Sequence, residues 1–487
     1  MDLGPQLLRL IFRLMTGFGL FTWLSRKLFG ARITAVAAVT LQATYRFRLF
    51  PALLVFLLLT VVVLPLVIKD DGTARGLTQI LLTYTMGISV SLLGFSTLWL
   101  ACGVLARDIE DCTIQTLAVK PIARWEIWIG KWLGVVALNA ILLSFIGVAV
   151  YTSVMYRASK LPDEQKIVLR DQILVGRGSV KAPVPDLKAD IENTLQERLK
   201  EPSIAAMDPV FVRQQVEEMV KGREQYVPPL MGKRWDLDFG AMKNLVVDRQ
   251  MQIRVKFNKG VLTQITSFPV MFQVGPPGDP RMIRIETALA DDSYHEIPIV
   301  PNLLDAEGKL NVEFYNMGPV PLMVPLEDGI EVLYYESGFG INFCRGLVIV
   351  FLWLALLAAL GLAAASYMSF PVAAFFSLAM LVVALSSGVM ENVVRDGTVT
   401  GVNHETGKAV GSIVDLVIVP MFRLMLKLVN LVKEFSPIDS LSSGRSVSWW
   451  TLLKAVGQIG VLVTGLLGLI GIGLFYRREL ASVQQTS

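Results

Sequence analysis

The sequence predicts a polytopic α-helical membrane protein with six transmembrane helices and a water-exposed α+β domain inserted between the third and the fourth. Of its 487 residues, 53% are hydrophobic and 18% are charged, whereas soluble proteins carry about 25% charged residues. Residues 157–336 hold 27 of the 41 acidic and 22 of the 45 basic side chains, which leaves 14 acidic and 23 basic ones for the rest. Three cysteines exclude a disulfide scaffold, and ordinary glycine and proline contents exclude collagen-like and disordered classes.

Six apolar runs account for the transmembrane prediction. A helix rises 1.5 Å per residue, so about 20 apolar residues cross the hydrocarbon core of a bilayer. The runs cover residues 49–68, 77–105, 132–156, 343–365, 370–385 and 456–476. We therefore expect spans one to three within 49–156, spans four and five within 341–385, and span six with a short tail within 456–487.

Lysine and arginine near the ends of these runs predict the orientation, because cytoplasmic loops are enriched in both. Residues 1–48 carry seven basic side chains against one acid, the loop after span two carries four more, and the tail begins with Arg477 and Arg478. Both termini are therefore expected in the cytoplasm and residues 157–340 outside it. Segment 386–455 is also basic, although six spans place it outside.

Two segments have the composition of helices that lie in the membrane interface. In 1–48, arginines interrupt the apolar run and no small-residue cleavage site follows, so an amphipathic cytoplasmic helix is favoured over a signal peptide. Residues 411–434 contain a run long enough to span, but Asp415, Pro420 and Arg423 make a lipid-exposed crossing costly. An extracytoplasmic interfacial or re-entrant segment in 386–455 is therefore favoured over a seventh span.

Residues 157–340 are predicted to form an extracytoplasmic domain in two parts. In 162–235 apolar residues recur at helical spacing, with Asp208 and Pro209 at one helix start. In 248–338 several short runs alternate between apolar and polar residues and are separated by turn clusters. This pattern favours a β-sandwich preceded by a helical part. It leaves two roles open, a binding module and a structural lid or partner-docking domain.

Residue combinations typical of enzymes and cofactor sites are missing. His295 and His404 are the only histidines, and neither has the spacing or the cysteine partners of a metal site. Residues 401–408 resemble a phosphate-binding loop but have one residue too many and Ala409 in place of Ser or Thr, and 441–445 resemble an ABC signature without a nucleotide domain. We expect no catalytic, cofactor-binding or metal residues and no nucleic-acid partner. The absence of carboxylates from the six runs argues against an ion-driven transporter.

The loop 106–131 between spans two and three is predicted to dock on a cytoplasmic partner. Asp108 and Glu110 stand at the expected start of a short helix, where carboxylates favour the positive helix end. Ile114 and Leu117 fall on one face of that helix. The residues expected to end the helix or to border the membrane are Lys120, Pro121, Arg124, Trp125 and Trp128. A solvated loop would explain the charges, but not the apolar face or the two tryptophans.

The order of these residues resembles the permease subunits of ABC-2 type transporters. That family typically has an acid, a Thr-Leu element, a Lys-Pro pair, an arginine and a Gly-Lys pair that opens the third span. The matching residues here are Glu110, Thr116, Leu117, Lys120, Pro121, Arg124, Gly130 and Lys131. The chain end, with 435–439, 444–448 and 475–479, is similar to the family's usual ending. The resemblance covers 41–156 and 344–480, and the large outer domain departs from compact members.

The resemblance implies a multi-pass subunit of a bacterial inner membrane that pairs with a second permease copy or homologue and with two ABC ATPase subunits. Residues 108–128 would be the coupling helix, and ATP with magnesium would bind to the ATPase subunits. Export of a hydrophobic or amphipathic substrate is the first interpretation. An ATPase-coupled, non-transporting module whose outer domain acts on a cell-envelope partner is the second. A membrane-anchored binding protein without an ATPase is the third.

Overall fold

The computed structural model describes residues 30–46, 49–67, 74–115, 121–169, 173–205, 207, 209–246, 249–261, 263–399, 414–433 and 435–478. The chain forms two compact units. The membrane unit comprises residues 1–174, 339–391 and 422–487, and the β unit comprises residues 175–338 and 392–421. Most of the amphipathic segment predicted in 1–48 lies outside the described residues.

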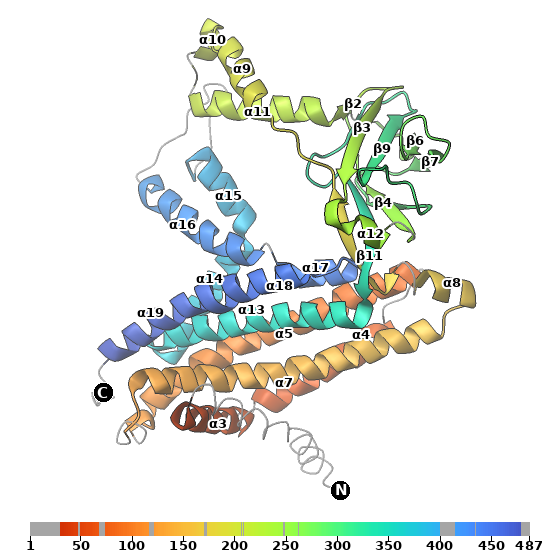
Figure 1. The fold of residues 1–487 in the computed structure, drawn as a ribbon. Helices are drawn as coiled ribbons and strands as arrows, with labels where there is room; N and C mark the ends of the chain where they lie inside the picture. Colours follow the sequence, from red (N-terminus) through yellow and green to blue (C-terminus); the bar gives the residue numbers. More distant parts are fainter. Residues whose placement is uncertain are drawn as a thin grey trace. The chain divides into compact units, whose positions relative to one another are not determined.

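Long helices make up the membrane unit (Figure 1). They are α3 (Ala31–Arg46), α4 (Leu49–Val67), α5 (Ala74–Glu110), α7 (Arg124–Ser159), α13 (Phe339–Ala365), α14 (Phe370–Leu385), α18 (Trp449–Ala455), the π-helical η3 (Val456–Val463) and α19 (Thr464–Arg477). Among the described residues, four helices are long and apolar enough to cross a membrane: Leu82–Glu110, Arg124–Ser159, Phe339–Ala365 and Trp449–Arg477. Helices α14 and α15 (Ser387–Asp396) meet at a bend of 66° and pass the same test only together, as one broken span or as a re-entrant loop, so the number of such segments is four or five. The chain is therefore a membrane protein with a separate β-sheet domain.

The first predicted span coincides with α4, some of whose side chains lie outside the described residues, so the number six stays a prediction. Four helices begin earlier than the apolar runs that predicted them, and two of them do so by seven or more residues. Helix α7 begins at Arg124, before 132, and the last helix begins at Trp449, before 456. Hydropathy marks only the stretch that matches hydrocarbon, whereas helical hydrogen bonding continues through polar residues. The Ser448 hydroxyl fixes one such start because it accepts a hydrogen bond from the Thr451 amide at 3.0 Å.

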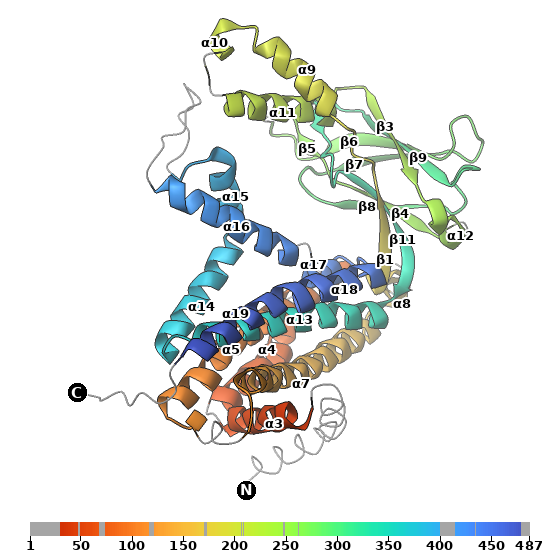
Figure 2. The ribbon, with the colours of Figure 1, turned by 60° about the vertical axis from the view of Figure 1, so that its left-hand side comes forward.

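Small residues set the closest helix contacts of the membrane unit. Helix α3 lies along α7 (Figure 1), and a Cβ atom added at Gly134 would meet the Ala37 carbonyl oxygen at 2.8 Å. Helix α13 lies against α5 and α19 (Figure 2), and a Cβ atom at Gly361 would meet the Ala101 Cβ atom at 2.8 Å. Such close approaches are typical of helix packing in membranes, where van der Waals contact replaces much of the hydrophobic driving force.

The β unit contains eleven strands within the described residues. They are β1 (Val175–Lys181), β2 (Tyr226–Val227), β3 (Gly232–Asp238), β4 (Met251–Val255), β5 (Asn258–Lys259), β6 (Phe268–Val274), β7 (Ile283–Leu289), β8 (His295–Ile299), β9 (Lys309–Asn316), β10 (Leu322–Met323) and β11 (Ile330–Gly338). They form two four-stranded antiparallel sheets, β1-β11-β4-β8 and β3-β9-β6-β7, and a small sheet β2-β10-β5. Both large sheets contribute to one core, in which Phe257, Phe272 and Phe314 are fully buried.

Helices occur in 162–235, as the sequence predicts, but this part is not purely helical. The helices within it are α8 (Asp163–Val168), α9 (Lys188–Arg198), α10 (Pro202–Ala205) and α11 (Pro209–Gln225), with α12 (Lys243–Val246) following. Strands β1 and β2 and the start of β3 also lie in this range, which corrects the prediction. Strand β1 lacks a strong alternating pattern because Gly176 and Gly178 occupy it, and Gly178 leaves room for the Tyr334 ring of the paired strand.

Three further helices follow the fifth apolar run: α15, α16 (Asp415–Lys433) and α17 (Pro437–Ser442). Helix α16 contains Pro420 and covers most of the segment predicted to be interfacial or re-entrant. Residues 401–408, which resemble a phosphate-binding loop, lie outside the described residues, as does His404.

Candidate coupling site at the helix ends

Five helix ends of the membrane unit meet at one place. They are the carboxyl-terminal ends of α5, α13 and α19 and the amino-terminal ends of α7 and α14, and hydrogen bonds join them. The connection from α5 to α7 and the connection from α13 to α14 therefore both begin and end here. Residues 111–115, the turn 366–369 and Arg478 therefore lie on the same side of the unit.

Asp108 and Glu110 belong to the last turn of α5, and not to the start of a new helix as the sequence suggested. Helix α5 continues to Glu110, and the chain then turns at Cys112, whose φ of 57° is left-handed. Carboxylates at a carboxyl-terminal helix end oppose the helix dipole, so they need partners elsewhere. Asp108 forms an ion pair with Lys131 of α7. Glu110 Oε1 accepts a hydrogen bond from the Phe370 amide of α14 at 2.7 Å.

Two arginines bind the carbonyl groups at the ends of other helices. Arg124 Nη1 donates to the carbonyl oxygens of Phe475 and Tyr476 at 3.1 and 2.9 Å, and to that of Arg478 at 3.0 Å. Arg478 Nη1 in turn donates to the Ala365 carbonyl oxygen of α13 at 3.0 Å. Both guanidinium groups lie at carboxyl-terminal helix ends, where positive charge is favourable. Burial lowers the pKa of Arg478, and the charge of Glu110 opposes that shift.

Ile114 and Trp128 are buried in the chain's own core. Ile114 is fully buried and Trp128 is 3% exposed, and both belong to a cluster that contains Phe475. The Trp128 Nε1 atom donates to the Ser366 hydroxyl at 3.1 Å, and a Cβ atom at Gly471 would lie 2.9 Å from the indole. The apolar face predicted to dock on a partner is therefore used internally at Ile114. The sequence showed its periodicity but not which neighbour would cover it.

Four exposed residues of this loop define what we call the exposed loop face: Asp111, Gln115, Pro121 and Trp125. Trp125 lies in the first turn of α7 and is 43% exposed. Leu117 and Lys120, the other two residues predicted for the site, lie outside the described residues. Sequence reasoning missed the contributions of Ser366, Phe370 and Arg478, because each is more than 200 residues distant from its partner on the loop or on α7.

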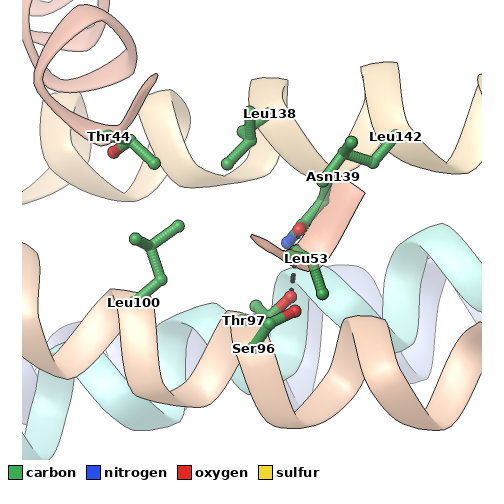
Figure 3. Close-up of a pocket in the computed structure, with 8 residues that line it drawn as sticks. All are labelled: Thr44, Leu53, Ser96, Thr97, Leu100, Leu138, Asn139 and Leu142. Atoms are coloured by element: carbon green, nitrogen blue, oxygen red, sulfur yellow. Dashed lines mark hydrogen bonds between the residues drawn. The ribbon is translucent and has the colours of Figure 1, made fainter. Parts of the chain in front are cut away.

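A polar contact joins α5 and α7 deeper in the membrane unit, beside a partly open cavity (Figure 3). The Thr97 hydroxyl lies 2.9 Å from Asn139 Oδ1, and both side chains are nearly fully buried. The cavity is lined by Thr44, Leu53, Ser96, Thr97, Leu100, Leu138, Asn139 and Leu142. Such bonds between membrane helices contribute about 0.6 kcal/mol on average and fix the register of the two helices more than they stabilise them.

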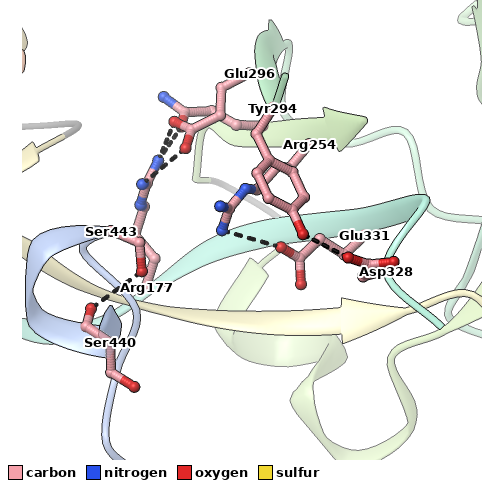
Figure 4. Close-up of polar contacts among 9 residues, drawn as sticks. Arg177, Arg254, Tyr294, Glu296, Asp328, Glu331, Ser440 and Ser443 are labelled. Carbon is pink, nitrogen blue, oxygen red and sulfur yellow. Dashed lines mark hydrogen bonds and ion pairs between the residues drawn. The ribbon is translucent and has the colours of Figure 1, made fainter. Parts of the chain in front are cut away.

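The β unit has a buried layer of four charged side chains and one glutamine on one face of the sheet β1-β11-β4-β8 (Figure 4). Its members are Arg177, Gln252, Arg254, Glu296 and Glu331, each at most about one tenth exposed. Arg177 binds Glu296 through both of its terminal nitrogens, at 2.6 and 3.1 Å, and Arg254 Nη1 lies 3.3 Å from Glu331 Oε1. Opposite charges alternate across the strands, so the layer is an ion-pair network that fixes strand pairing.

Comparisons with protein-family models, with curated proteins and with solved structures give no match for this chain. Within the described residues, no group of three or more His, Cys, Asp or Glu side chains is arranged to hold a metal ion. The His295 Nε2 atom lies 2.9 Å from the Ser293 hydroxyl and 2.9 Å from the Ala290 carbonyl oxygen, contacts that hold the side chain at the start of β8 against the preceding turn.

Proposed function

We propose that this chain is the permease subunit of an ABC-2 type, ATP-driven transporter of a bacterial inner membrane, and that it exports a hydrophobic or amphipathic substrate. In this proposal both termini are cytoplasmic and residues 157–340 are extracytoplasmic. Its partners are ABC ATPase subunits, which bind ATP and magnesium, and a second permease copy or homologue. The motif order in 107–134 and at the chain end supports the proposal, as does the membrane character of the helices.

The observation that carries the proposal is the way the loop is tied to the helices. Glu110 binds the start of α14, Arg124 binds the end of α19, and Arg478 links that end to α13. In this proposal, a partner that displaces the exposed loop face acts on α13, α14 and α19 through these bonds. A nucleotide-driven partner biases a transporter only through contacts that differ between its states, and the proposal assigns that role to these bonds.

Trp125→Ala tests the docking. Exposed tryptophans at interfaces often contribute about 2 kcal/mol or more, which corresponds to about a 30-fold loss of affinity. We expect wild-type protein to co-purify with an ABC ATPase identified by mass spectrometry, and Trp125→Ala to lose most of it. Trp450→Ala is the matched control, because Trp450 is 65% exposed at the opposite end of the helix Trp449–Arg477. Wild type without an ATPase, or equal recovery in both variants, contradicts the proposal.

The second candidate, a non-transporting module that acts on an envelope partner, is favoured by the independent core of the β unit. Residues 175–338 begin and end next to each other in the antiparallel pair of β1 and β11, so a short linker can replace them. If a variant in which a linker replaces residues 175–338 still exports substrate, the transporter hypothesis is supported. If the same variant keeps the ATPase activity of the complex but cells that carry it show a cell-envelope defect, the non-transporting module is supported.

A further inference from the structure

A second cavity of the membrane unit lies between α3, α5 and α7 and contains charged groups. It is small, with a volume of about 50 Å³, and is partly open. Four of its lining residues come from α3, including Val39, Thr40 and Ala43. Helix α5 contributes Asp108, and α7 contributes Lys131. The other lining residues are Val36, Gly103 and Val104, so apart from Thr40 and the charged pair the walls are apolar.

The Lys131 ammonium group retains one hydrogen-bond donor for an occupant of this cavity. The side chain is 3% exposed. Of its three N–H groups, one donates to the Val104 carbonyl oxygen at 2.8 Å and one to the Asp108 carboxylate. No third acceptor for Lys131 occurs among the described residues. The Asp108 side chain is 39% exposed, so its carboxylate keeps room for a second donor. The cavity thus offers a cationic donor next to an anionic acceptor.

The position of the pair along the helices places it near lipid headgroups. Asp108 is two residues from the end of α5, and Lys131 is about 10 Å along α7 from Arg124. The uninterrupted apolar stretches of both helices begin beyond these residues. On α3, Val39 is 59% exposed, which gives the cavity an apolar border.

We propose that this cavity binds the headgroup of a zwitterionic phospholipid that carries a protonated primary amine, such as phosphatidylethanolamine. The phosphate of the lipid accepts a hydrogen bond from the remaining N–H of Lys131. The ammonium group of the lipid donates a hydrogen bond to the Asp108 carboxylate. The apolar wall of α3 contacts the upper part of an acyl chain. The Lys131–Asp108 pair has no net charge, so a zwitterion matches it better than an anionic headgroup does. A quaternary ammonium has no N–H to donate and loses that contact. The inference is independent of the proposed transport function.

The first test compares headgroups on the purified, delipidated full chain in detergent. The probes are dioleoyl lipids with ethanolamine, N,N-dimethylethanolamine, choline and glycerol headgroups, and lipid retention is measured by native mass spectrometry. We expect ethanolamine lipid to bind about tenfold more tightly than choline lipid, as loss of one charged hydrogen bond implies, with the dimethyl form between them. Equal retention of all four lipids, or preference for the anionic glycerol headgroup, overturns the proposal.

The second test blocks the cavity without unpairing its charges. Substituting Lys131 or Asp108 alone would leave a buried charge unpaired and could unfold the chain. Ala43→Trp instead places a large side chain at the exposed border of the cavity. Val148→Trp, at a position of α7 that is 65% exposed and does not line the cavity, is the control. We expect the ethanolamine preference to vanish in Ala43→Trp and to persist in Val148→Trp. Its persistence in Ala43→Trp overturns the proposal.

Discussion

Glu110→Ala tests whether this carboxylate joins two helices of the chain or serves an external partner. The start of helix α14 lacks a side-chain cap of its own, because the Ser369 side chain makes no capping bond. The Phe370 amide would have no intrahelical partner, and Glu110 of α5 supplies one at 2.7 Å. The loss of a helix cap costs about 1 kcal/mol. The carboxylate also interacts favourably with the positive end of α14 and unfavourably with the negative end of α5, and these two terms largely offset each other. Glu110→Ala should therefore destabilise the isolated chain by about 1 kcal/mol.

The assay is thermal unfolding of the purified chain in detergent, in the absence of any ATPase. At about 2 to 4 °C per kcal/mol for domains of 150–250 residues, the shift should be a few degrees. Glu110→Gln keeps an acceptor oxygen and should lose about half of that. Asp111→Ala is the control, because Asp111 is an exposed acid on the same bend, and its removal should change stability by less than about 0.5 kcal/mol. Equal unfolding temperatures for Glu110→Ala and Asp111→Ala would refute the internal role of Glu110.

Three further predictions concern the outer domain and the topology. Residues 175–338 expressed alone should give a circular dichroism spectrum of mixed strand and helix, and Phe314→Ala, which removes a fully buried ring 5.3 Å from that of Phe272, should lower the free energy of unfolding by about 3 to 5 kcal/mol in a urea titration. A reporter that is active only outside the cytoplasm should be active when fused at Asn258 and inactive at the chain end; activity at both points would contradict an even number of spans. Hydrogen bonds from Arg281 lower the pKa of Asp279 to about 2, so its carboxylate should stay charged until the pH falls to that value and the ion pair should be lost only there; in an NMR titration a midpoint near 4 would contradict this.

The sequence alone determined the class of protein and the division of the chain. A membrane span can be predicted without tertiary contacts, because each apolar residue of the run contributes to the free energy of transfer into the bilayer. Strict alternation in 251–257 likewise predicted β4, because one face of that strand had to be buried. Strand β1 could not be found in this way. Its two glycines carry no pattern, and its partner β11 lies more than 150 residues further along the chain.

At the helix ends, only the tertiary structure decided what each charged residue does. Asp108, Glu110 and Arg124 were recognisable as special because charges beside a membrane span need partners. Their partners are Lys131, a backbone amide of α14 and the carbonyl groups of α19. The last two are backbone groups, which every residue has, so the sequence cannot reveal them as partners. The burial of Ile114 likewise depends on which helices surround it, and not on its own spacing. The local sequence determines where helices form and where charged residues lie along them. The packing of helices that are distant in the sequence determines which charged groups come into contact and which surface stays exposed.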